Sequence, residues 1–271
     1  MPQNTSSAVM QQRRDKAHKS LDDFPTPPWG TRGEIEHVLR PLLAGRHYAD
    51  LKNRVVVDPC CNRGHMVRPL TEYFGRVYHS DIADYGSDPL RAVLPDGAPF
   101  QPGGRADFLL PSWEKAFPRA AAADWFFLNP PYKLGERFIA KALDLAREGV
   151  AVFVRCAFGE GIERYEKIFR DTPPTAIAYF AQRIMLFENR LRDPDIKYWD
   201  PKAHKGRGGW VRPSSATAYV WMTWLKDTPR LPTLWIPPRR KALTRPGDYP
   251  VNPDQKGVFV PPAAAGQEAL L

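Results

Sequence analysis

Short apolar runs alternate with helical patterns along most of the chain, and this alternation limits the fold more than any other feature. Apolar side chains recur at spacings of three and four in Thr31–Leu43, Leu134–Arg147 and Ile162–Arg170, as in amphipathic helices. Seven strand-like runs alternate with helical patterns: Val55–Val57, Arg76–Ile82, Ala106–Leu110, Asp124–Leu128, Val150–Ala157, Ala176–Phe187 and Ala216–Trp224. The alternation predicts an α/β fold with a Rossmann-like, doubly wound, mostly parallel sheet of seven strands.

The last two runs depart from this alternation. Only the polar segment 188–215 separates Ala176–Phe187 from Ala216–Trp224. We therefore expect these two strands to pair antiparallel, which places an antiparallel strand at one edge of the sheet.

The two ends of the chain differ in composition from the middle. Residues 1–20 are polar and aperiodic, which predicts a disordered, basic N-terminal segment. Prolines and basic residues recur over 226–271, so we expect a partly extended C-terminal tail. The globular domain is then expected over 21–225, with 188–215 inserted in it.

One strand-like run ends abruptly at Asn129-Pro130-Pro131-Tyr132. Prolines cannot donate to a sheet ladder, and they hold the preceding residue in an extended conformation. Trp125–Leu128 therefore reads as a buried strand followed by a stiff turn. In an open parallel sheet, ligands bind at this carboxyl edge. A rigid amide and phenol there favour a small, planar substrate that forms hydrogen bonds.

Acidic residues lie at the ends of two of the predicted strands. The first, Val55–Val57, runs into Asp58-Pro59-Cys60 and a turn that contains Gly64, without the further glycines of a dinucleotide site. Asp81 and Ile82 end the second strand, about 20 residues after the first turn, where an acid can accept from ribose hydroxyls. Each segment alone also fits an ordinary turn or helix cap. Together they favour a cationic, ribose-containing ligand without phosphate.

These motifs, taken in order, resemble those of S-adenosylmethionine-dependent amino-methyltransferases. The order is Asp-Pro-x-x-x-x-Gly, an acid, Asp107-Phe108, and Asn-Pro-Pro-Tyr. The likeness extends over about residues 23–224 and is strongest to DNA adenine-N6 methyltransferases, especially the short phage-type enzymes. It implies a class I methyltransferase domain of a bacterial or phage protein. Asn62 departs from the family, which usually has glycine there.

The resemblance also implies roles for single residues. Asp58 would hold the methionine end of S-adenosylmethionine, Asp81 the ribose, and Asp107 with Phe108 the adenine. Phe24 and Thr26, in the segment Phe-Pro-Thr-Pro, would lie near the methionine moiety. The implied cofactor contacts are Phe24, Thr26, Asp58, Pro59, Cys60, Gly64, Asp81, Ile82, Asp107 and Phe108.

The chemistry of an exocyclic amine explains the tetrapeptide. The lone pair of adenine's exocyclic amine is delocalised into the purine ring, so this nitrogen is a poor nucleophile. The side-chain oxygen of Asn129 and the carbonyl of Pro130 can both accept from it and aim the lone pair at a sulfonium methyl, while Pro131 keeps the turn rigid. Tyr132 offers a stacking surface for a base rotated out of the duplex.

A basic, aromatic segment is the candidate for DNA recognition. The formal net charge is +9, which suits a nucleic-acid partner without requiring one. Segment 188–215 mixes cations, which contact phosphates, with aromatic rings; its alternative reading is a solvated charged loop. The predicted nucleic-acid contacts are Arg183, Phe187, Arg190, Arg192, Lys197, Lys202, Lys205, Arg207, Trp210 and Arg212.

Cysteine usage and hydropathy narrow the setting. The three cysteines, Cys60, Cys61 and Cys156, have no zinc-like spacing, and neighbouring cysteines rarely pair. No segment has the length of a membrane span, and the first 20 residues lack the apolar block of a signal peptide. We expect a reduced, cytoplasmic protein without a metal.

Two other functions stay open at this stage. The same fold and cofactor can methylate RNA or a protein glutamine amide, because both present a planar conjugated nitrogen to the tetrapeptide. A protein of a different class, a non-catalytic nucleic-acid-binding protein, would require a broken cofactor pocket. The segment 24–29 before the sheet and the basic insert after the sixth predicted strand favour DNA.

Overall fold

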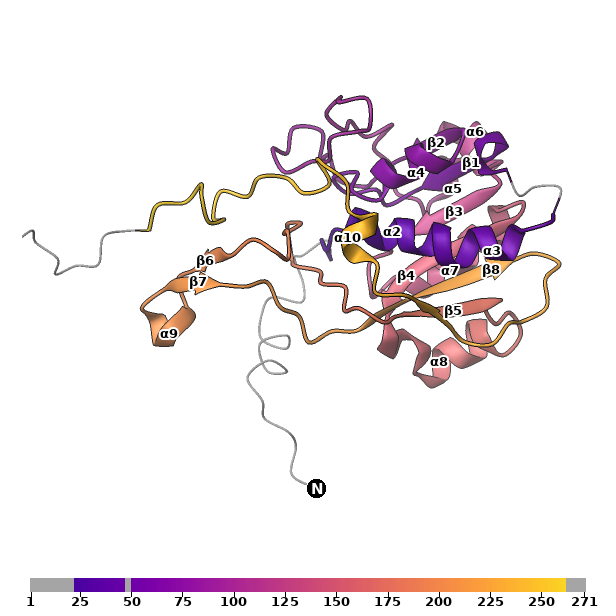
Figure 1. Cartoon of the computed structure of the whole chain (residues 1–271). Helices are drawn as coiled ribbons and strands as arrows, with labels where there is room; N and C mark the ends of the chain where they lie inside the picture. The colour runs from indigo at the N-terminus through magenta and orange to yellow at the C-terminus, as the bar shows by residue number, and fades with distance from the viewer. Residues whose placement is uncertain (1–21, 47–49, 262–271) are drawn as a thin grey trace, which may run out of the picture.

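The computed structural model describes residues 22–46 and 50–261, and a seven-stranded sheet forms their centre (Figure 1). The strand order is β2-β1-β3-β4-β8-β5-β9, and only β8 runs antiparallel to its neighbours. The strands are β1 (Val55–Asp58), β2 (Arg76–His79), β3 (Trp125–Leu128), β4 (Gly149–Arg155), β5 (Ala176–Phe180), β8 (Tyr219–Leu225) and β9 (Leu234–Ile236). The predicted doubly wound, mostly parallel sheet of seven strands is confirmed.

Two members of the sheet differ from the expectation. Residues 106–110 form no strand: Asp81 and Arg105 make a single parallel bridge, and the chain then turns, with the Leu110 amide donating to the Asp107 carbonyl. The seventh strand is instead β9, from the proline-rich segment, which pairs in parallel with β5. A short Leu-Trp-Ile run between prolines carries little signal in sequence, and the free side of β5 makes it a strand.

The antiparallel strand lies further in than expected. β5 and β8 pair antiparallel as predicted, through Ala176–Tyr179 and Val220–Thr223. β8 also pairs with β4 along its full length, so it lies between β4 and β5, while β9 forms the rim. The carboxyl ends of β4 and β5 and the start of β8 therefore share one edge of the sheet.

Helices cover both faces of the sheet (Figure 1). On one face lie α4 (Val67–Tyr73) and a continuous helix made of α2 (Pro28–Glu34), the π-helical turn η1 (Ile35–Leu39) and α3 (Arg40–Leu43). This helix starts three residues before the predicted Thr31, because Pro28 suits the first helical position. The other face carries α5 (Pro111–Ala116), α6 (Pro118–Ala121), α7 (Gly135–Leu145) and α8 (Ile162–Arg164) with the π-helical turn η4 (Tyr165–Phe169). Short 3₁₀ turns are η2 (Leu51–Asn53) and η3 (Cys156–Gly159).

The core is divided by the alternation of side chains along the strands. Trp125 and Phe127 of β3 pack with α2 and α4, whereas Phe126 and Leu128 pack with α7. All four side chains are fully buried, which explains why this strand is apolar without interruption.

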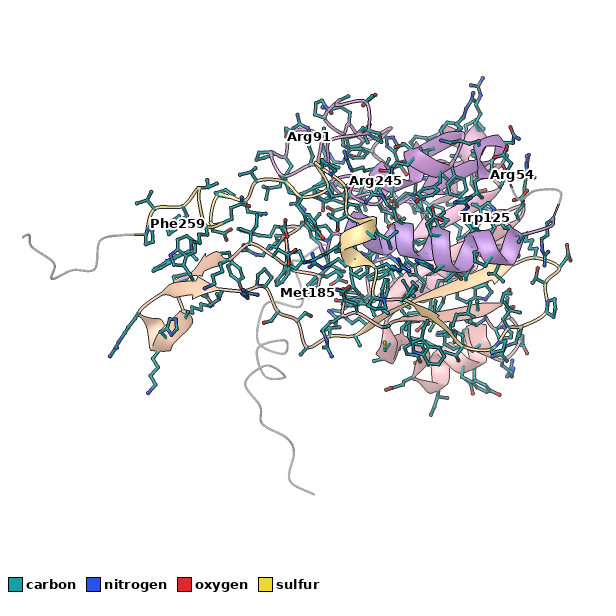
Figure 2. The ribbon with its side chains drawn as sticks, in the orientation of Figure 1. Arg54, Arg91, Trp125, Met185, Arg245 and Phe259 are labelled. Carbon is teal, nitrogen blue, oxygen red and sulfur yellow. The ribbon has the colours of Figure 1, made fainter. Side chains whose placement is uncertain are left out.

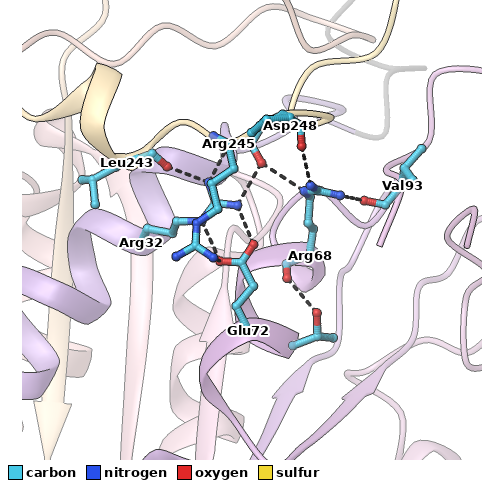
Figure 3. A network of polar contacts seen from close by, with 9 residues as sticks. Arg32, Arg68, Glu72, Val93, Leu243, Arg245 and Asp248 are labelled. Carbon is cyan, nitrogen blue, oxygen red and sulfur yellow. Dashed lines mark hydrogen bonds and ion pairs between the residues drawn. The ribbon is translucent and has the colours of Figure 1, made fainter. Parts of the chain in front are cut away.

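The proline-rich segment is not a separate tail in its described part, 226–261. After β9 it forms α10 (Arg240–Leu243), which packs on α2, and it then reaches the buried residue Asp248 (Figure 3). Asp248 accepts from both Nη atoms of Arg32, at 2.6 and 2.8 Å, and from Nε of Arg68 at 3.0 Å. The domain therefore extends beyond residue 225. The predicted N-terminal segment 1–20 and the last ten residues of the tail lie outside the described residues.

Arg32 lies at the centre of this polar network. Its Nε and Nη2 donate to Glu72 at 2.8 and 2.6 Å, and its Nη1 donates to the carbonyl of Leu243 at 2.7 Å. Arg245 also pairs with Glu72, at 2.9 Å. The side chains of Arg32 and Asp248 are fully buried, so the pair is compensated entirely by protein groups.

An arm projects from the carboxyl edge of the sheet (Figure 1). We define the arm as residues 188–215; it contains a hairpin of β6 (Tyr198–Asp200) and β7 (Gly209–Val211), joined by α9 (Ala203–Gly206). The C-terminal segment runs along the hairpin: the Trp199 amide donates to the Asp254 carbonyl, and the Lys256 amide to the Lys197 carbonyl. Figure 2 shows Phe259, in this C-terminal segment beside the arm, well apart from Trp125 in the core.

We predict that Asp248→Asn destabilises the fold by about 3–5 kcal/mol, because it leaves Arg32 and Arg68 undercompensated inside the protein. The measurement is the free energy of unfolding in urea. Asp171→Asn is the matched control, since Asp171 pairs with Arg170 on the exposed surface, and it should leave the urea midpoint unchanged. Equal midpoints for wild type and Asp248→Asn would contradict the network's role.

Candidate active site

A cavity of about 400 Å³ opens at the carboxyl ends of β1 and β3. Three of its walls come from the turns after β1, β2 and β3, and a fourth from the segment before α2. Of the predicted cofactor contacts, the following line it: Phe24, Thr26, Asp58, Pro59, Cys60, Asp81, Ile82, Asp107 and Phe108. Asn129 and Pro131 line it too, so the motifs meet in one cavity.

Asp58 is buried at the end of β1, with 1% of its surface exposed. Burial is the main cause that raises its pKa, to about 8, and the neighbouring Asp81 adds to the rise; the amide of Cys60, which donates to Oδ1 at 3.2 Å, opposes it. A carboxyl group in this state lacks a cation. Within residues 22–46 and 50–261, Asp58, Asp81 and Asp107 form no ion pair.

Asp81 organises the turn after β1 while it faces the cavity. Its two carboxylate oxygens accept from the amides of Asn62 and Ala83, at 2.8 and 2.9 Å. Burial raises its pKa, and these amide hydrogen bonds partly offset the rise. Asp81 therefore both stabilises the turn and faces the cavity, where a ligand could bind.

The turn after β1 explains the departure at Asn62. Asn62 has a φ of 48°, in the left-handed region that asparagine tolerates better than most residues. Gly64 has a φ of 79°, and a Cβ there would lie 2.3 Å from the ring of Phe100. Gly64 does not line the cavity. The packing of Phe100, and not ligand approach, is what requires a glycine there.

Asp107 and Phe108 differ in how far they are available. The Asp107 carboxylate accepts from the amide of Leu109 at 2.9 Å and remains half-buried at the cavity wall. Phe108 is 1% exposed, and its ring packs on Trp113 and Phe138 with centroid distances of 4.9 and 5.3 Å. Phe108 therefore belongs to the core as well as to the cavity wall.

Asn129 joins the tetrapeptide to the N-terminal wall. Its Nδ2 donates to the carbonyl of Phe24 at 2.8 Å and to Oγ1 of Thr26 at 2.9 Å. Because a carbonyl can only accept, the amide nitrogen must face Phe24 and the oxygen Oδ1 must face away. Neither Oδ1 nor the carbonyl of Pro130 accepts a hydrogen bond from another group within 22–46 and 50–261. The turn thus holds two acceptors without donors.

Tyr132 lies beside the cavity and not in its wall. Its hydroxyl is 3.3 Å from that of Tyr219, and its backbone amide donates to Asp22 at 3.1 Å. The guanidinium carbon of Arg155 is 3.8 Å from the ring centroid, and the ring of Phe24 is tilted against it at 5.5 Å. The phenol is therefore held on several sides.

Several cavity residues were not predicted from the sequence. Asn62, His65, Tyr85 and Lys133 all line it, and Asp22 joins them from the N-terminal segment. Asn62, His65 and Lys133 adjoin predicted motifs, so a wider reading of each turn would have included them. Tyr85 carried no signal, because the loop after β2 brings it to the cavity only in the folded chain.

The arm divides the predicted nucleic-acid contacts into structural and exposed residues. Arg190 and Arg192 pair with Asp254 at 2.9 and 2.6 Å, and Arg192 also lies over the ring of Tyr198. These two arginines fasten the C-terminal segment to the hairpin. Arg183, at the base of the arm, donates to the carbonyls of Ser215 and Ala216.

The remaining predicted contacts lie in two environments. Trp210 packs against Trp199 and Phe259, and Phe187 lies near Tyr198, so both rings are part of the arm's own packing. The exposed cations of the arm are Lys197, Lys202, Lys205, Arg207 and Arg212. They give the arm a basic surface on the same edge of the sheet as the cavity.

The described residues contain neither a cluster of metal ligands nor a helix suited to crossing a membrane. In 22–46 and 50–261, no three or more metal-ligating side chains gather in a group. Over the same residues, no helix combines the length and the apolar character that crossing a bilayer requires.

No protein-family model and no curated protein sequence matches the chain. Among solved structures it is similar to a type I restriction-modification methyltransferase subunit from Streptococcus thermophilus, with a TM-score of 0.46 and 12% identity over 76% of this chain. That alignment covers 46% of the Streptococcus chain, so this chain spans less than half of that subunit's length.

Two other solved structures are also methyltransferases by assignment. One, from Listeria monocytogenes, is assigned to the class I S-adenosylmethionine-dependent enzymes: TM-score 0.42, 10% identity, 88% of this chain and 72% of the other. The second, from Pyrococcus horikoshii, is assigned as an RNA methyltransferase: TM-score 0.41, 15% identity, 82% and 99%. At these levels of similarity, the evidence for the fold is the strand order of the chain itself.

Proposed function

We propose that this protein transfers a methyl group from S-adenosylmethionine to the exocyclic amine of an adenine flipped out of DNA. One observation carries the proposal. The Asn129 amide is fixed by Phe24 and Thr26 so that its oxygen, beside the carbonyl of Pro130, is an acceptor without a donor at the wall of an acidic cavity.

The cavity suits S-adenosylmethionine in charge and size. A volume of about 400 Å³ lies within the range of small-molecule sites. S-adenosylmethionine carries an ammonium and a sulfonium, and when bound it supplies an electrophilic methyl group. Asp58, buried without an ion-pair partner among the described residues, would receive the ammonium; Asp81 would accept from the ribose hydroxyls and Asp107 from the adenine amine.

The tetrapeptide would act on the acceptor nitrogen by positioning. The two hydrogens of an exocyclic amine match Asn129 Oδ1 and the Pro130 carbonyl, and donation to both directs the nitrogen lone pair away from them. Transfer would form an N–C bond as the C–S bond of the sulfonium breaks, and the nitrogen would then lose one proton to solvent. Pro130 and Pro131 keep both acceptors fixed, so the protein needs little rearrangement.

Tyr132 would contribute to holding the flipped base. Extrusion of a base costs a few kcal/mol, and one aromatic stack returns about 1–3 kcal/mol. Arg155 already covers one side of the phenol, so the base would stack on the remaining accessible part of the ring. The exposed cations of the arm, on the same edge of the sheet, would contact DNA phosphates.

The choice of a nucleic acid over a protein acceptor comes from the arm. RNA and a glutamine amide present the same kind of nitrogen, and the tetrapeptide would serve them equally. A basic arm with exposed lysines favours a polyanion over a protein acceptor.

We predict that labelled S-adenosylmethionine transfers its methyl group to DNA and not to RNA or protein offered separately under the same conditions. Nucleosides from the digested DNA should carry the label as N6-methyladenosine in its deoxy form. Label in RNA or in protein would show that this molecule, and not DNA, is the acceptor. Label in none of them, with cofactor binding intact, would favour a non-catalytic nucleic-acid-binding protein.

We predict that Asn129→Ala lowers kcat by at least about 100-fold, because one fixed acceptor is lost from the transition state. Cofactor affinity should fall by less than about tenfold, since only the anchoring of Phe24 and Thr26 is disturbed. Thr26→Val is the matched control: it removes one anchor but keeps the acceptor oxygen, so kcat at saturating cofactor should stay close to wild type. Equal losses of kcat in the two variants would make the amide structural.

We predict that cofactor binding releases a proton near neutral pH. The pKa of Asp58 is about 8 in the free protein, and a bound ammonium would lower it, so affinity should rise as pH approaches 8 and level off above it. Calorimetry in buffers of different ionisation enthalpy counts the proton. Asp58→Asn should bind more weakly and without this release; an unchanged release in the variant would assign the proton elsewhere.

A further inference from the structure

Arg155 stands beside the tetrapeptide although the sequence motifs do not include it. It is the last residue of β4, which pairs in parallel with β3 through Leu128 and Val152. Three residues beyond this pair, Arg155 is level with the Pro131–Tyr132 end of the turn. The opposite partner of Arg155, on β8, is Tyr219.

The guanidinium lies against aromatic rings and not against a carboxylate. Its carbon is 3.8 Å from the Tyr132 ring centroid and 5.7 Å from that of Phe24. Its Nε is buried and donates no hydrogen bond to the described part of the chain. Arg155 also forms no ion pair with any of the described residues.

Other arginines at comparable burial are compensated. Arg32 pairs with Glu72 and Asp248, Arg63 with Asp23 and Asp88, and Arg240 with Asp195. A cation–π contact is worth about 0.5–2 kcal/mol and supplies no counter-charge. The half-buried charge of Arg155 is therefore incomplete without an anion.

The donor set of the group indicates which anion. The guanidinium lies over the Tyr132 ring and also interacts with the hydroxyls of Tyr132 and Tyr219, which are neutral, so its five N–H donors form a planar fork with capacity left for an anion. This planar fork matches the oxygens of a phosphate, which it can bind through two parallel hydrogen bonds.

We infer that Arg155 binds a backbone phosphate of the flipped nucleotide. The inference rests on the proposed function, and it adds a phosphate subsite to the acceptor side of the cavity. A single stack then serves both parts of one nucleotide: Tyr132 contacts the base, and the guanidinium held on its ring contacts the phosphate. Arg155 thus couples base flipping to backbone binding.

The salt dependence of DNA binding tests this subsite. Binding of mixed-sequence double-stranded DNA is measured with S-adenosylhomocysteine present, for wild type, Arg155→Met, Arg155→Lys and the control Arg170→Met. Loss of one phosphate contact should lower the slope of log affinity against log salt by about 0.9 in Arg155→Met and reduce affinity about tenfold. Arg155→Lys keeps the charge and should keep the slope. Arg170 is exposed and paired with Asp171, so its variant should match wild type.

The outcomes separate the subsite from the proposed function. A wild-type slope in a folded Arg155→Met protein would overturn the phosphate contact, whatever the acceptor assay gives. A slope lowered to the same extent in Arg155→Lys would also overturn it, because the charge would then have no part. Slopes as expected, with no methyl transfer to any nucleic acid, would leave the contact standing and overturn the proposed function.

Discussion

The buried guanidinium of Arg32 is the interaction on which the rest of the architecture depends. It joins α2, α4 and the segment after α10, which lie more than 200 residues apart at the extremes of the described chain. Glu72 and Asp248 must both be present, because a buried arginine that loses a carboxylate costs several kcal/mol. This network ties α2 to α4 and to the C-terminal segment, and the segment before α2 forms a wall of the cavity. It also fixes the C-terminal segment that continues to the arm.

A second polar anchor works on the same principle inside the cavity. Asn129 donates both amide hydrogens, one to the carbonyl of Phe24 and one to the hydroxyl of Thr26. These bonds join the N-terminal wall and the tetrapeptide into one unit. The Asp23–Arg63 pair, at 2.6 Å, ties the same wall to the turn after β1. The proposed cofactor site and the proposed acceptor site therefore share their supports, and changes in either should be felt in both.

Charge is separated across the carboxyl edge of the sheet. The cavity is acidic, and burial raises the pKa of Asp58 and of Asp81. The arm is basic and exposed. Arg155 lies between the two zones, against the ring of Tyr132. Such a division would draw a cationic cofactor inward and hold a polyanionic substrate outside, with the acceptor amine at the boundary.

The sequence by itself determined the alternating elements and most of the cavity wall. Strand ends are marked by local chemistry: Asp58 follows a buried β-branched run, and Asn129 is held extended by the proline after it. The tertiary structure alone decided which partners these residues meet. β9 became a strand because β5 had a free side with which it could pair. Residues 106–110 did not become a strand, because the pairing with the segment after β2 is limited to the single bridge between Asp81 and Arg105. The sequence predicts Arg190 and Arg192 as DNA contacts. In the structure both form ion pairs with Asp254, more than 60 residues further along the chain. Period and turn chemistry act over a few residues, whereas the pairing of charges depends on which distant segments folding brings together.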